Sequence, residues 1–403
     1  MWLSRNSQLN RNSHPKIVIL GGGFAGLQAV RALSRAGLSS TLIERNAYTT
    51  MLPVLPDLAA DWIPEESAHQ PIAGLMPENC QFKQAEVLAV DPNRRLVETN
   101  AGRFPYDYLI VATGSVADLK GLQAEGTIYS LDSLESARRI CRAWKELIKS
   151  HEPILVFAGA GYTGIELALA LAAKLKDQLS EKSRIVMVEK NSKILPFLTD
   201  SQRAYVQRKI TDANIELCLE TTVRQATEEE VILSNGETIR HHLLFTTAGS
   251  KAAVDNFKDG LELVAGGRIR VNSCLQAEGG DRIYAAGDAA AITDSHGAVL
   301  RKAVNFSYYS GRRAGRNIAL AVAGRAPRPF RPFDAGWVIP LHDTAVGNLF
   351  SRLPVKGRLP LRLHYFMCGW RHYSGRKKRF FYKLSLARLH RAPGAGTHGC
   401  GGE

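Results

Sequence analysis

Two glycine-rich stretches of this 403-residue chain have the residue spacing that binds the phosphates of a dinucleotide. In the first, Gly21, Gly23 and Gly26 form a G-x-G-x-x-G pattern directly after the apolar run Lys16–Leu20. The first glycine allows a tight turn, the second lets the backbone approach a pyrophosphate, and the third lets a helix pack on the strand. Glu44 ends the next apolar run, where a carboxylate can accept hydrogen bonds from both hydroxyls of a ribose.

The second stretch repeats this arrangement. Gly159, Gly161 and Gly164 follow the apolar run Ile154–Phe157, and Glu189 ends the run after the intervening helical pattern. The interval from Gly159 to Glu189 is 30 residues, longer than the usual ~20, and the long helical stretch between them absorbs the difference. Two such patterns predict two dinucleotides with electrons passing between them, one a hydride donor that comes and goes and one a flavin that stays.

Further predicted strands end in motifs of small residues, and one of these motifs carries an acid. They are Ala112, Thr113 and Gly114, then Ala248 and Gly249, and finally Gly287 and Asp288. A carboxylate at the Asp288 position can hydrogen-bond the hydroxyls of a ribityl chain, or it can simply cap a helix.

The alternation of β-branched apolar runs with helical patterns predicts an α/β fold with two Rossmann-like dinucleotide-binding domains and a basic C-terminal helical region. A chain of 403 residues is long enough for two or three domains. We expect a discontinuous first domain at 14–148 and 268–325 and a second domain at 149–267. A C-terminal region at 326–392 and a disordered tail at 393–403 follow.

The net charge of +14 is concentrated near the C-terminus. Residues 351–391 contain 12 Lys and Arg residues and no acid, and residues 300–332 contain 8 and again no acid. Within the first of these ranges, apolar residues recur at helical spacing: Leu359, Leu363, Phe366, Trp370 and Tyr373. Basic amphipathic helices with aromatic residues lie in the headgroup plane of anionic membranes, so we expect membrane docking here. The alternative is a stripe that packs on the protein's own core or on a second copy.

Composition argues against several other functions. The six cysteines form no C-x-x-C motif, so neither a zinc site nor a redox-active disulfide is expected, and the scattered thiols suggest a reducing compartment. We expect no metal site, no secretory signal in the polar N-terminus, and no membrane span, because no run of 18 apolar residues occurs.

Taken together, the motifs resemble the two-dinucleotide-binding flavoprotein reductases. Within this group the chain is most similar to the type II NADH:quinone oxidoreductases, which are single-subunit enzymes that pump no protons. The segments VILGGGFAGL, YDYLIVATG, AGAGYTGIELA and RIYAAGDAA and the basic aromatic C-terminal region carry the resemblance, over roughly residues 15–390. The resemblance implies hydride transfer from NADH to FAD and transfer of two electrons to a membrane quinone.

The resemblance also implies which residues bind each cofactor. FAD would be bound in the first domain by Gly21, Gly23, Phe24, Ala25, Gly26, Glu44, Val87, Ala112, Thr113, Gly114, Gly287 and Asp288. NADH would be bound in the second by Gly159, Gly161, Tyr162, Thr163, Gly164, Glu189, Ala248 and Gly249. The Glu189 carboxylate favours NADH because it repels a 2′-phosphate, although the neighbouring Lys190 leaves room for NADPH.

Three residues are implied in catalysis: Glu166, Asn305 and Tyr309. Glu166 matches the family's acidic residue beside the nicotinamide and the flavin, although it could instead be an ordinary acid in the first turn of a helix. The family's quinone motif A-x-Q-x-A-x-Q-x-G is altered here, with Asn305, Ser307 and Tyr309 replacing Gln, Ala and Gln. Asn305 and Tyr309 could still contact a quinone, or the aromatic residues of this stretch could be core, so the acceptor's identity stays open.

The expected location is the cytoplasmic face of the membrane, as a peripheral enzyme, with an anionic membrane surface as partner and room for a homodimer. The main alternative is a soluble NAD(P)H-dependent reductase of an acidic electron carrier such as a ferredoxin or rubredoxin. A basic flavoprotein that binds nucleic acid is a weaker alternative, because no nucleic-acid-binding motif occurs. Disulfide reductases and sulfide:quinone reductases are disfavoured because the cysteines those enzymes need are missing.

Overall fold

The computed structural model describes residues 15–118, 123–179, 183–247, 249–257 and 260–387, which fall into two compact units. The first unit comprises Met1–Thr49, Pro71–Ser115 and Lys251–Phe333, and the second comprises Thr50–Gln70, Val116–Ser250 and Asp334–Glu403. Residues 50–70 and 116–148 therefore group with the second glycine motif, whereas the sequence placed them in the first domain. The assignment of a cofactor to each domain stays a prediction, and the expected disordered tail lies outside the described residues.

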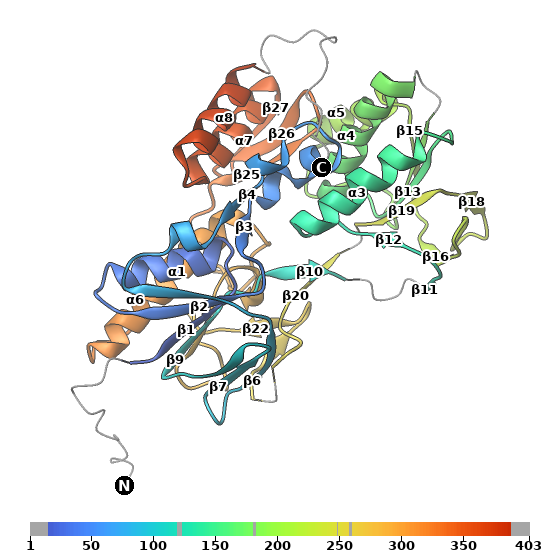
Figure 1. Ribbon diagram of the computed structural model, residues 1–403. Coiled ribbons are helices and arrows are strands. Elements are labelled where there is room, and N and C mark those ends of the chain that lie inside the picture. Colours follow the sequence, from blue (N-terminus) through green and yellow to red (C-terminus); the bar gives the residue numbers. More distant parts are fainter. Residues whose placement is uncertain (1–14, 119–122, 180–182, 248, 258–259, 388–403) are drawn as a thin grey trace. The chain divides into compact units, whose positions relative to one another are not determined.

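The first unit is built on a five-stranded parallel sheet with the strand order β23-β9-β1-β2-β5 (Figure 1). Its strands are β1 (Ile17–Leu20), β2 (Ser40–Glu44), β5 (Cys80–Gln84), β9 (Tyr108–Val111) and β23 (Ile283–Ala285). The central strands β1 and β9 are buried along their whole length, as expected for a parallel sheet covered on both faces.

Helices α1 (Phe24–Ser34) and α6 (Val304–Val322) pack side by side in the first unit (Figure 1). Two glycines of α6 make this close approach possible. A Cβ at Gly311 would lie 2.0 Å from the carbonyl oxygen of Ala25, and a Cβ at Gly315 would lie 2.7 Å from that of Ala29. The small residues of both helices therefore let the two backbones touch, which positions the first turn of α1 against α6.

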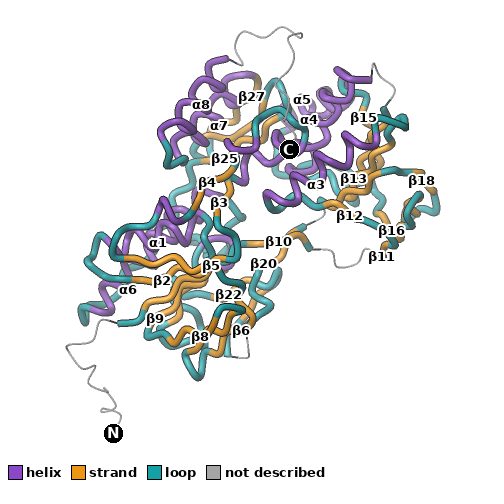
Figure 2. The backbone as a smooth tube through the Cα atoms, viewed as in Figure 1, coloured by secondary structure: helices purple, strands orange, loops and turns teal. Residues whose placement is uncertain are grey.

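Smaller sheets complete the first unit (Figure 2). One antiparallel sheet contains β6 (Val87–Asp91), β7 (Leu96–Thr99) and β8 (Gly102–Pro105). A second sheet contains β21 (Leu263–Val264), β22 (Arg268–Arg270) and β24 (Ala290–Ala291). The unit also contains the 3₁₀ turns η3 (Ala73–Leu75) and η4 (Gly287–Ala289). The chain passes between the two units within two short strand pairs, β3 (Tyr48–Thr50) with β4 (His69–Pro71) and β10 (Ser115–Ala117) with β20 (Ser250–Ala252).

The second unit repeats the sheet of the first, with the strand order β12-β19-β13-β14-β15 and all pairings parallel. Its strands are β12 (Ile128–Tyr129), β13 (Ile154–Ala158), β14 (Arg184–Val188), β15 (Ile215–Cys218) and β19 (Leu243–Thr246). In both sheets the strand before the glycine motif is central, and the strand beside it leads to the glutamate, which is the last residue of β2 and the residue after β14. The duplication read from the sequence is therefore a duplication of the sheet itself.

Three helices and a four-stranded sheet accompany this second sheet. The helices are α3 (Leu134–Leu147), α4 (Tyr162–Leu179) and α5 (Asp200–Asp212). The small sheet contains β11 (Gln123–Ala124), β16 (Val223–Ala226), β17 (Glu230–Leu233) and β18 (Thr238–Arg240). Helices α3 and α5 each begin with a capping box, at Ser133 and Thr199. The hydroxyl of each residue accepts a hydrogen bond from the backbone N–H three residues later.

The C-terminal region from Asp334 onward also belongs to the second unit, together with η1 (Leu52–Val54), α2 (Leu55–Ala59) and η2 (Glu65–Ser67). It forms an antiparallel sheet of β25 (Gly336–Pro340), β26 (Ala345–Leu349) and β27 (Leu353–Gly357). Helices α7 (Arg358–Arg371) and α8 (Gly375–Ala387) follow and pack against each other (Figure 1).

Helix α7 has two apolar faces. One face, with Leu361, Tyr365 and Cys368, is buried. The other is the stripe found in the sequence, where Leu359 is 60% exposed and Trp370 is 65% exposed. The stripe is therefore not part of the protein's own core.

The fold class expected from the sequence is confirmed: two Rossmann-like parallel sheets and a basic helical C-terminal region. Within the described ranges, no helix combines enough length and apolar character to cross a bilayer. The five cysteines in these ranges are free thiols.

The contact between α1 and α6 predicts the effect of adding one methyl group. Replacing Gly311 with Ala forces the two helices apart, and we expect the free energy of unfolding to fall by about 2–3 kcal/mol. Gly74→Ala is the matched control, because a Cβ there would meet no atom within 4 Å. Urea unfolding of both variants measures the difference, and equal stabilities would contradict the proposed close contact.

Candidate functional site

The first glycine motif forms a cradle between β1 and α1. Gly21 has a φ of +99°, and a Cβ there would lie 2.3 Å from the carbonyl oxygen of Ala112. A Cβ at Gly26 would lie 1.9 Å from the carbonyl oxygen of Gly21. At Gly23, in contrast, a Cβ would meet no atom within 4 Å. Open space therefore lies before the N-terminus of α1, whose unpaired N–H groups are suited to bind phosphate.

The Glu44 side chain closes this cradle from the end of β2. Its Oε2 accepts a hydrogen bond from the backbone N–H of Gly22 at 2.8 Å. Its Oε1 accepts from the backbone N–H of Asn46 at 3.0 Å and from Asn46 Nδ2 at 3.2 Å. The carboxylate is thus placed at the glycine-rich turn, as a ribose-binding acid must be.

The second glycine motif forms an equivalent cradle between β13 and α4. Gly159 has a φ of +107°, and a Cβ at Gly164 would lie 2.5 Å from Thr247 Oγ1 and 3.0 Å from the carbonyl oxygen of Gly159. A Cβ at Gly161 would meet no atom closer than 3.5 Å, so this position is again open.

Glu189 takes the place of Glu44 in this second cradle. Its Oε2 accepts from the backbone N–H of Ala160 at 3.0 Å, and its Oε1 accepts from Asn191 N at 3.0 Å and Asn191 Nδ2 at 2.6 Å. Tyr162 and Thr163 begin α4, and the Tyr162 side chain is exposed. The predicted residues of this site therefore lie around one turn, with a carboxylate fixed beside it.

The small-residue motifs at the strand ends also lie where they were expected. Thr113 Oγ1 is buried and has no hydrogen-bond partner within the described residues, whereas its counterpart Thr247 donates to the carbonyl oxygen of Gly159 at 2.7 Å. Gly114 and Gly249 both have positive φ, +74° and +150°. A buried hydroxyl without a partner fits a bound group at the first cradle. Ala248 lies outside the described residues.

Gly287 and Asp288 are brought to the first cradle by β23. A Cβ at Gly287 would lie 3.1 Å from the Cβ of Ala25 in the first turn of α1. Asp288 accepts hydrogen bonds from Ser115 Oγ at 3.2 Å and Ser307 Oγ at 3.4 Å, and burial raises its pKa. Ser307, which replaces an alanine of the quinone motif, therefore contacts the acid predicted to bind the ribityl chain.

Phe24 and Val87 complete the predicted first site. Phe24 begins α1 and is half-buried. Val87 begins β6 in the small antiparallel sheet of the same unit, where its carbonyl oxygen accepts a hydrogen bond from Asn256 Nδ2. The contact of the Val87 backbone with a cofactor stays a prediction.

The first turns of α6 carry Asn305 and Tyr309, and the two residues differ in exposure. Asn305 is 8% exposed, and its Nδ2 donates to the carbonyl oxygen of Phe333 at 2.5 Å. Tyr309 is 41% exposed, and its ring meets that of Tyr308 edge-on at 5.4 Å. Phe306 is buried and belongs to the core. Asn305 thus supports the chain segment after α6, while Tyr309 presents its ring at the surface of the first unit.

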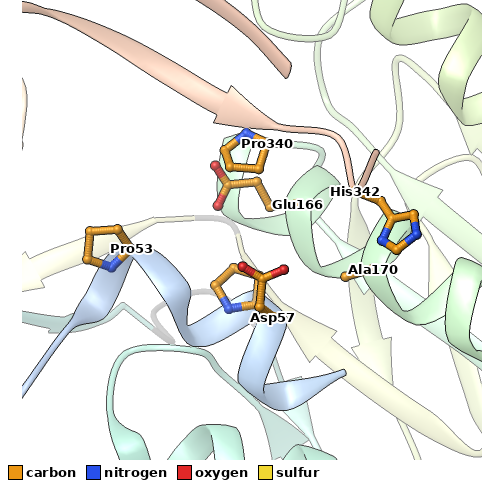
Figure 3. A pocket seen from close by; sticks show the side chains of 7 residues that line it. Pro53, Asp57, Glu166, Ala170, Pro340 and His342 are labelled. Atoms are coloured by element: carbon orange, nitrogen blue, oxygen red, sulfur yellow. The ribbon is translucent and has the colours of Figure 1, made fainter. Parts of the chain in front are cut away.

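Glu166 lies in the second unit and lines a small cavity (Figure 3). The cavity is lined by Pro53, Pro56, Asp57, Glu166, Ala170, Pro340 and His342. Figure 3 shows the carboxylates of Asp57 on α2 and Glu166 on α4 projecting into the same space. Burial, and secondarily the Asp57 carboxylate, raises the pKa of Glu166 well above its usual value. Glu166 therefore keeps its proton at pH values at which an exposed glutamate is ionised.

Helix α7 supports this carboxyl pair from its buried face. Tyr365 OH donates to Asp57 Oδ2 at 2.8 Å, and Asp57 is itself only 7% exposed. Burial raises the pKa of Cys368 to about 12; Arg371 opposes this shift, while Asp57 and Glu166 add to it. The Cys368 thiol is consequently protonated at neutral pH and is not a reactive thiolate.

Four residues that support the predicted acids were not identified from the sequence: Asp57, Tyr365, Asn46 and Asn191. Asp57 carries a readable signal, because it is the single acid in the apolar stretch 51–60. Tyr365 carries none, because it is 308 residues from its hydrogen-bond partner in the chain. Glu166 belongs to the second unit while Asn305 and Tyr309 belong to the first, so their joint role in catalysis stays a prediction.

The raised pKa of Glu166 predicts a pH dependence of stability. The folded state binds this proton more tightly than the unfolded chain does. The proton's contribution to the free energy of unfolding is therefore fully present below the unfolded pKa of about 4.3. It is lost as the pH rises toward the folded pKa, and each tenfold difference in proton affinity between the two states corresponds to about 1.4 kcal/mol.

Glu166→Gln should remove this loss, so its free energy of unfolding should fall less steeply than that of the wild type above about pH 4.3. Urea unfolding at a series of pH values measures the two slopes. Glu146→Gln, at a glutamate on α3 whose side chain is 76% exposed, is the control. Parallel slopes for wild type and Glu166→Gln would show that Glu166 titrates normally.

Comparisons with known proteins agree with this architecture. A type II NADH:quinone oxidoreductase of Staphylococcus haemolyticus is 29% identical over 365 residues, which is 84% of this chain and 90% of that protein. The structure of NDH2 from Plasmodium falciparum in complex with NADH is similar with a TM-score of 0.83 at 14% identity, covering 94% of this chain and 98% of that one. The sulfide:quinone oxidoreductase of Aquifex aeolicus is similar with a TM-score of 0.74 at 21% identity, covering 92% of each chain.

At these identities the two solved structures support the fold alone. The family assignment comes from the sequence pattern of the pyridine nucleotide-disulphide oxidoreductases, which matches residues 15–315 and so includes both glycine cradles and the start of α6. Because this match covers well over half of the chain, the protein belongs to the pyridine nucleotide-disulphide oxidoreductase family.

Proposed function

We propose that the protein is an FAD-dependent oxidoreductase that oxidises NADH and reduces a membrane quinone. The observation that carries this proposal is the duplicated cradle, since each of two parallel sheets presents an open glycine turn with a fixed carboxylate. Two dinucleotide sites in one chain suit a reaction in which one dinucleotide is the electron donor and the other stays bound. The relative from Staphylococcus haemolyticus, which this chain matches over most of its length, is named for this activity.

The first cradle is suited to FAD. Its glycine turn and the N-terminus of α1 would bind the pyrophosphate, Glu44 the adenosine ribose, and Asp288 the ribityl hydroxyls. The Thr113 hydroxyl is buried and has no hydrogen-bond partner in the part of the chain that the structure describes, and Asp288 accepts hydrogen bonds from two serines. A polar cofactor at this cradle could hydrogen-bond both groups. When bound, FAD supplies the redox chemistry, accepting a hydride and passing on two electrons.

The second cradle is suited to NADH. Glu189 would accept hydrogen bonds from the ribose hydroxyls, and its charge disfavours the 2′-phosphate of NADPH.

Overall, NADH, a proton and a quinone become NAD⁺ and a quinol, so one proton must be supplied beyond the transferred hydride. Glu166 lines a small cavity of the second unit, and its raised pKa suits it to hold a carboxyl proton, which is the role we assign to it. Tyr309, with its exposed ring, is the residue proposed to contact the quinone, and Asn305 holds the start of α6 in place.

Helices α7 and α8 are proposed to dock on an anionic membrane surface. The exposed apolar side chains of α7 and α8 are Leu359, Phe366, Met367, Trp370 and Leu386. Residues 376–379 add the sequence RKKR at the start of α8. Each Lys or Arg near an anionic surface contributes about 1 kcal/mol, and the apolar side chains add their burial. A lipid-soluble acceptor would be reached from such a position, whichever side of the membrane is used.

The alternative of a soluble reductase for an acidic carrier is not favoured. The exposed apolar face of α7 is not expected on a surface that binds its partner through charge alone. A homodimer and the cytoplasmic side stay predictions.

The quinone assignment predicts the phenotype of Tyr309→Leu. We expect quinone turnover to fall about tenfold or more, while reduction of the flavin by NADH in the absence of quinone keeps its wild-type rate. Tyr309→Phe should retain activity if the ring stacks on the acceptor and lose it if the hydroxyl is needed. Steady-state assays with a short-chain quinone and stopped-flow absorbance separate the two half-reactions. Tyr308→Leu is the neighbouring control, and equal quinone turnover by all variants would remove Tyr309 from the site.

The docking assignment predicts the behaviour of Phe366→Ser/Trp370→Ser. Loss of two exposed aromatic side chains should lower the affinity for anionic vesicles about tenfold or more, measured by sedimentation. Leu88→Ser is the matched control, because Leu88 is 56% exposed on β6 of the first unit. High salt should weaken binding without abolishing it, because salt screens charge and not apolar burial. Unchanged sedimentation of the double variant would place the docking surface elsewhere.

A further inference from the structure

The sequence E-[R/K]-N occurs at the ends of both ribose-side strands. Glu44 is the last residue of β2 and is followed by Arg45 and Asn46, while Glu189-Lys190-Asn191 directly follows β14. The glutamates are the acids proposed to bind the ribose hydroxyls. The asparagines stand two residues further along in each case, and the structure gives them the same contacts.

The hydrogen bonds of the two motifs match atom by atom. In each, Oε2 of the glutamate accepts from a backbone N–H of the glycine turn, at 2.8 Å for Gly22 and 3.0 Å for Ala160. In each, Oε1 accepts both the backbone N–H and the side-chain Nδ2 of the asparagine. We call this arrangement the carboxylate clamp.

The clamp limits what the carboxylate can do. A carboxylate has about four acceptor positions, and three donors use three of them. The remaining position is on Oε2, on the side of the glycine turn, where a ribose hydroxyl would be bound. An asparagine that merely ends a strand would use its own oxygen to accept a backbone N–H. Here Nδ2 donates to the glutamate instead, so the end of the strand does not explain the contact.

Holding the carboxylate in place matters most in the second cradle. Lys190 and Lys193 follow Glu189 by one and four residues in the chain, and both are exposed. If the carboxylate could turn away from the cradle, these ammonium groups would be available to a 2′-phosphate. A carboxylate held by three donors stays in place and keeps its charge where that phosphate would lie.

We propose that Asn191 is a specificity-determining positioning residue, which holds Glu189 so that the second cradle binds a dinucleotide with a free 2′-hydroxyl and rejects a 2′-phosphate. Asn46 positions Glu44 in the same way for the dinucleotide of the first cradle. This inference rests on the proposed function, because it assumes that NADH binds in the second cradle and FAD in the first.

The test is titration calorimetry of the FAD-loaded protein with NAD⁺ and NADP⁺, which bind without reducing the flavin. Loss of a hydrogen bond to a charged group should raise the NAD⁺ dissociation constant of Asn191→Ala about tenfold. The ratio of NADP⁺ to NAD⁺ affinity should rise. With NADH as substrate, KM should increase and kcat should stay the same, because Asn191 contacts no reacting atom.

Two further substitutions separate positioning from a general loss of structure. Asn191→Ser keeps a short donor and should lie between the wild type and Asn191→Ala. Asn191→Asp has nearly the same shape but cannot donate when ionised, so it should bind NAD⁺ more weakly than Asn191→Ala. Asn235→Ala, in the turn between β17 and β18, is the control for removing an asparagine from the second unit.

The first cradle supplies a mirror experiment. Asn46→Ala should raise the dissociation constant of FAD for the apoprotein, followed by flavin fluorescence, about tenfold. Once saturated with FAD, this variant should bind NAD⁺ as the wild type does. An Asn191→Ala variant with unchanged NAD⁺ affinity and an unchanged NADP⁺ to NAD⁺ ratio would overturn the inference. A wild-type protein that binds FAD but neither NAD⁺ nor NADH would overturn the proposed function as well.

Discussion

The close approach of backbone to backbone at the glycine turns is the constraint on which the rest of this structure depends. A Cβ at Gly21 would overlap the carbonyl oxygen of Ala112 at 2.3 Å, and a Cβ at Gly26 would overlap that of Gly21 at 1.9 Å. Gly311 repeats the constraint between α1 and α6. Because these glycines have no side chain, the strand, the turn and the helix can approach one another closely. The space in front of the helix N-terminus, at Gly23, stays open. The neighbouring strand then brings a carboxylate to that space, and the same arrangement occurs in both units.

The carboxyl pair of the second unit shows how packing changes the chemistry of ordinary residues. Asp57 and Glu166 come from different helices and line one cavity, and Tyr365 donates a hydrogen bond to one of them. Removing two carboxylates from water is costly unless one keeps its proton, which is why the pKa of Glu166 is raised. The result is a carboxyl group that keeps its proton to a higher pH than an exposed glutamate does, in a protein whose proposed reaction consumes a proton.

The C-terminal helices carry the surface that is proposed to dock on a membrane. Helix α7 uses one apolar face to pack on the second unit and leaves the other exposed. Tyr365 on the buried face reaches the carboxyl pair, so the same helix supports the cavity and carries the proposed docking surface. Helix α7 thus links the proposed docking surface to the Asp57 carboxylate through the hydrogen bond of Tyr365.

The amino-acid sequence by itself determined the two glycine turns, the glutamates beside them and the alternation of strands and helices. These features are local, because glycine conformation and hydrophobic periodicity depend on residues close in the chain. It also predicted the apolar stripe of α7, but not whether that stripe is buried, because periodicity describes a face and not what covers it.

Tertiary structure alone decided the rest. The Asp57–Tyr365 contact joins residues 308 apart in the chain, and the grouping of residues 50–70 with the second unit depends on long-range packing. The E-[R/K]-N repeat is present in the sequence, but only the hydrogen-bond geometry shows that Asn46 and Asn191 hold the glutamates. Contacts between distant segments are set by the packing of whole sheets and helices, and no local spacing records them.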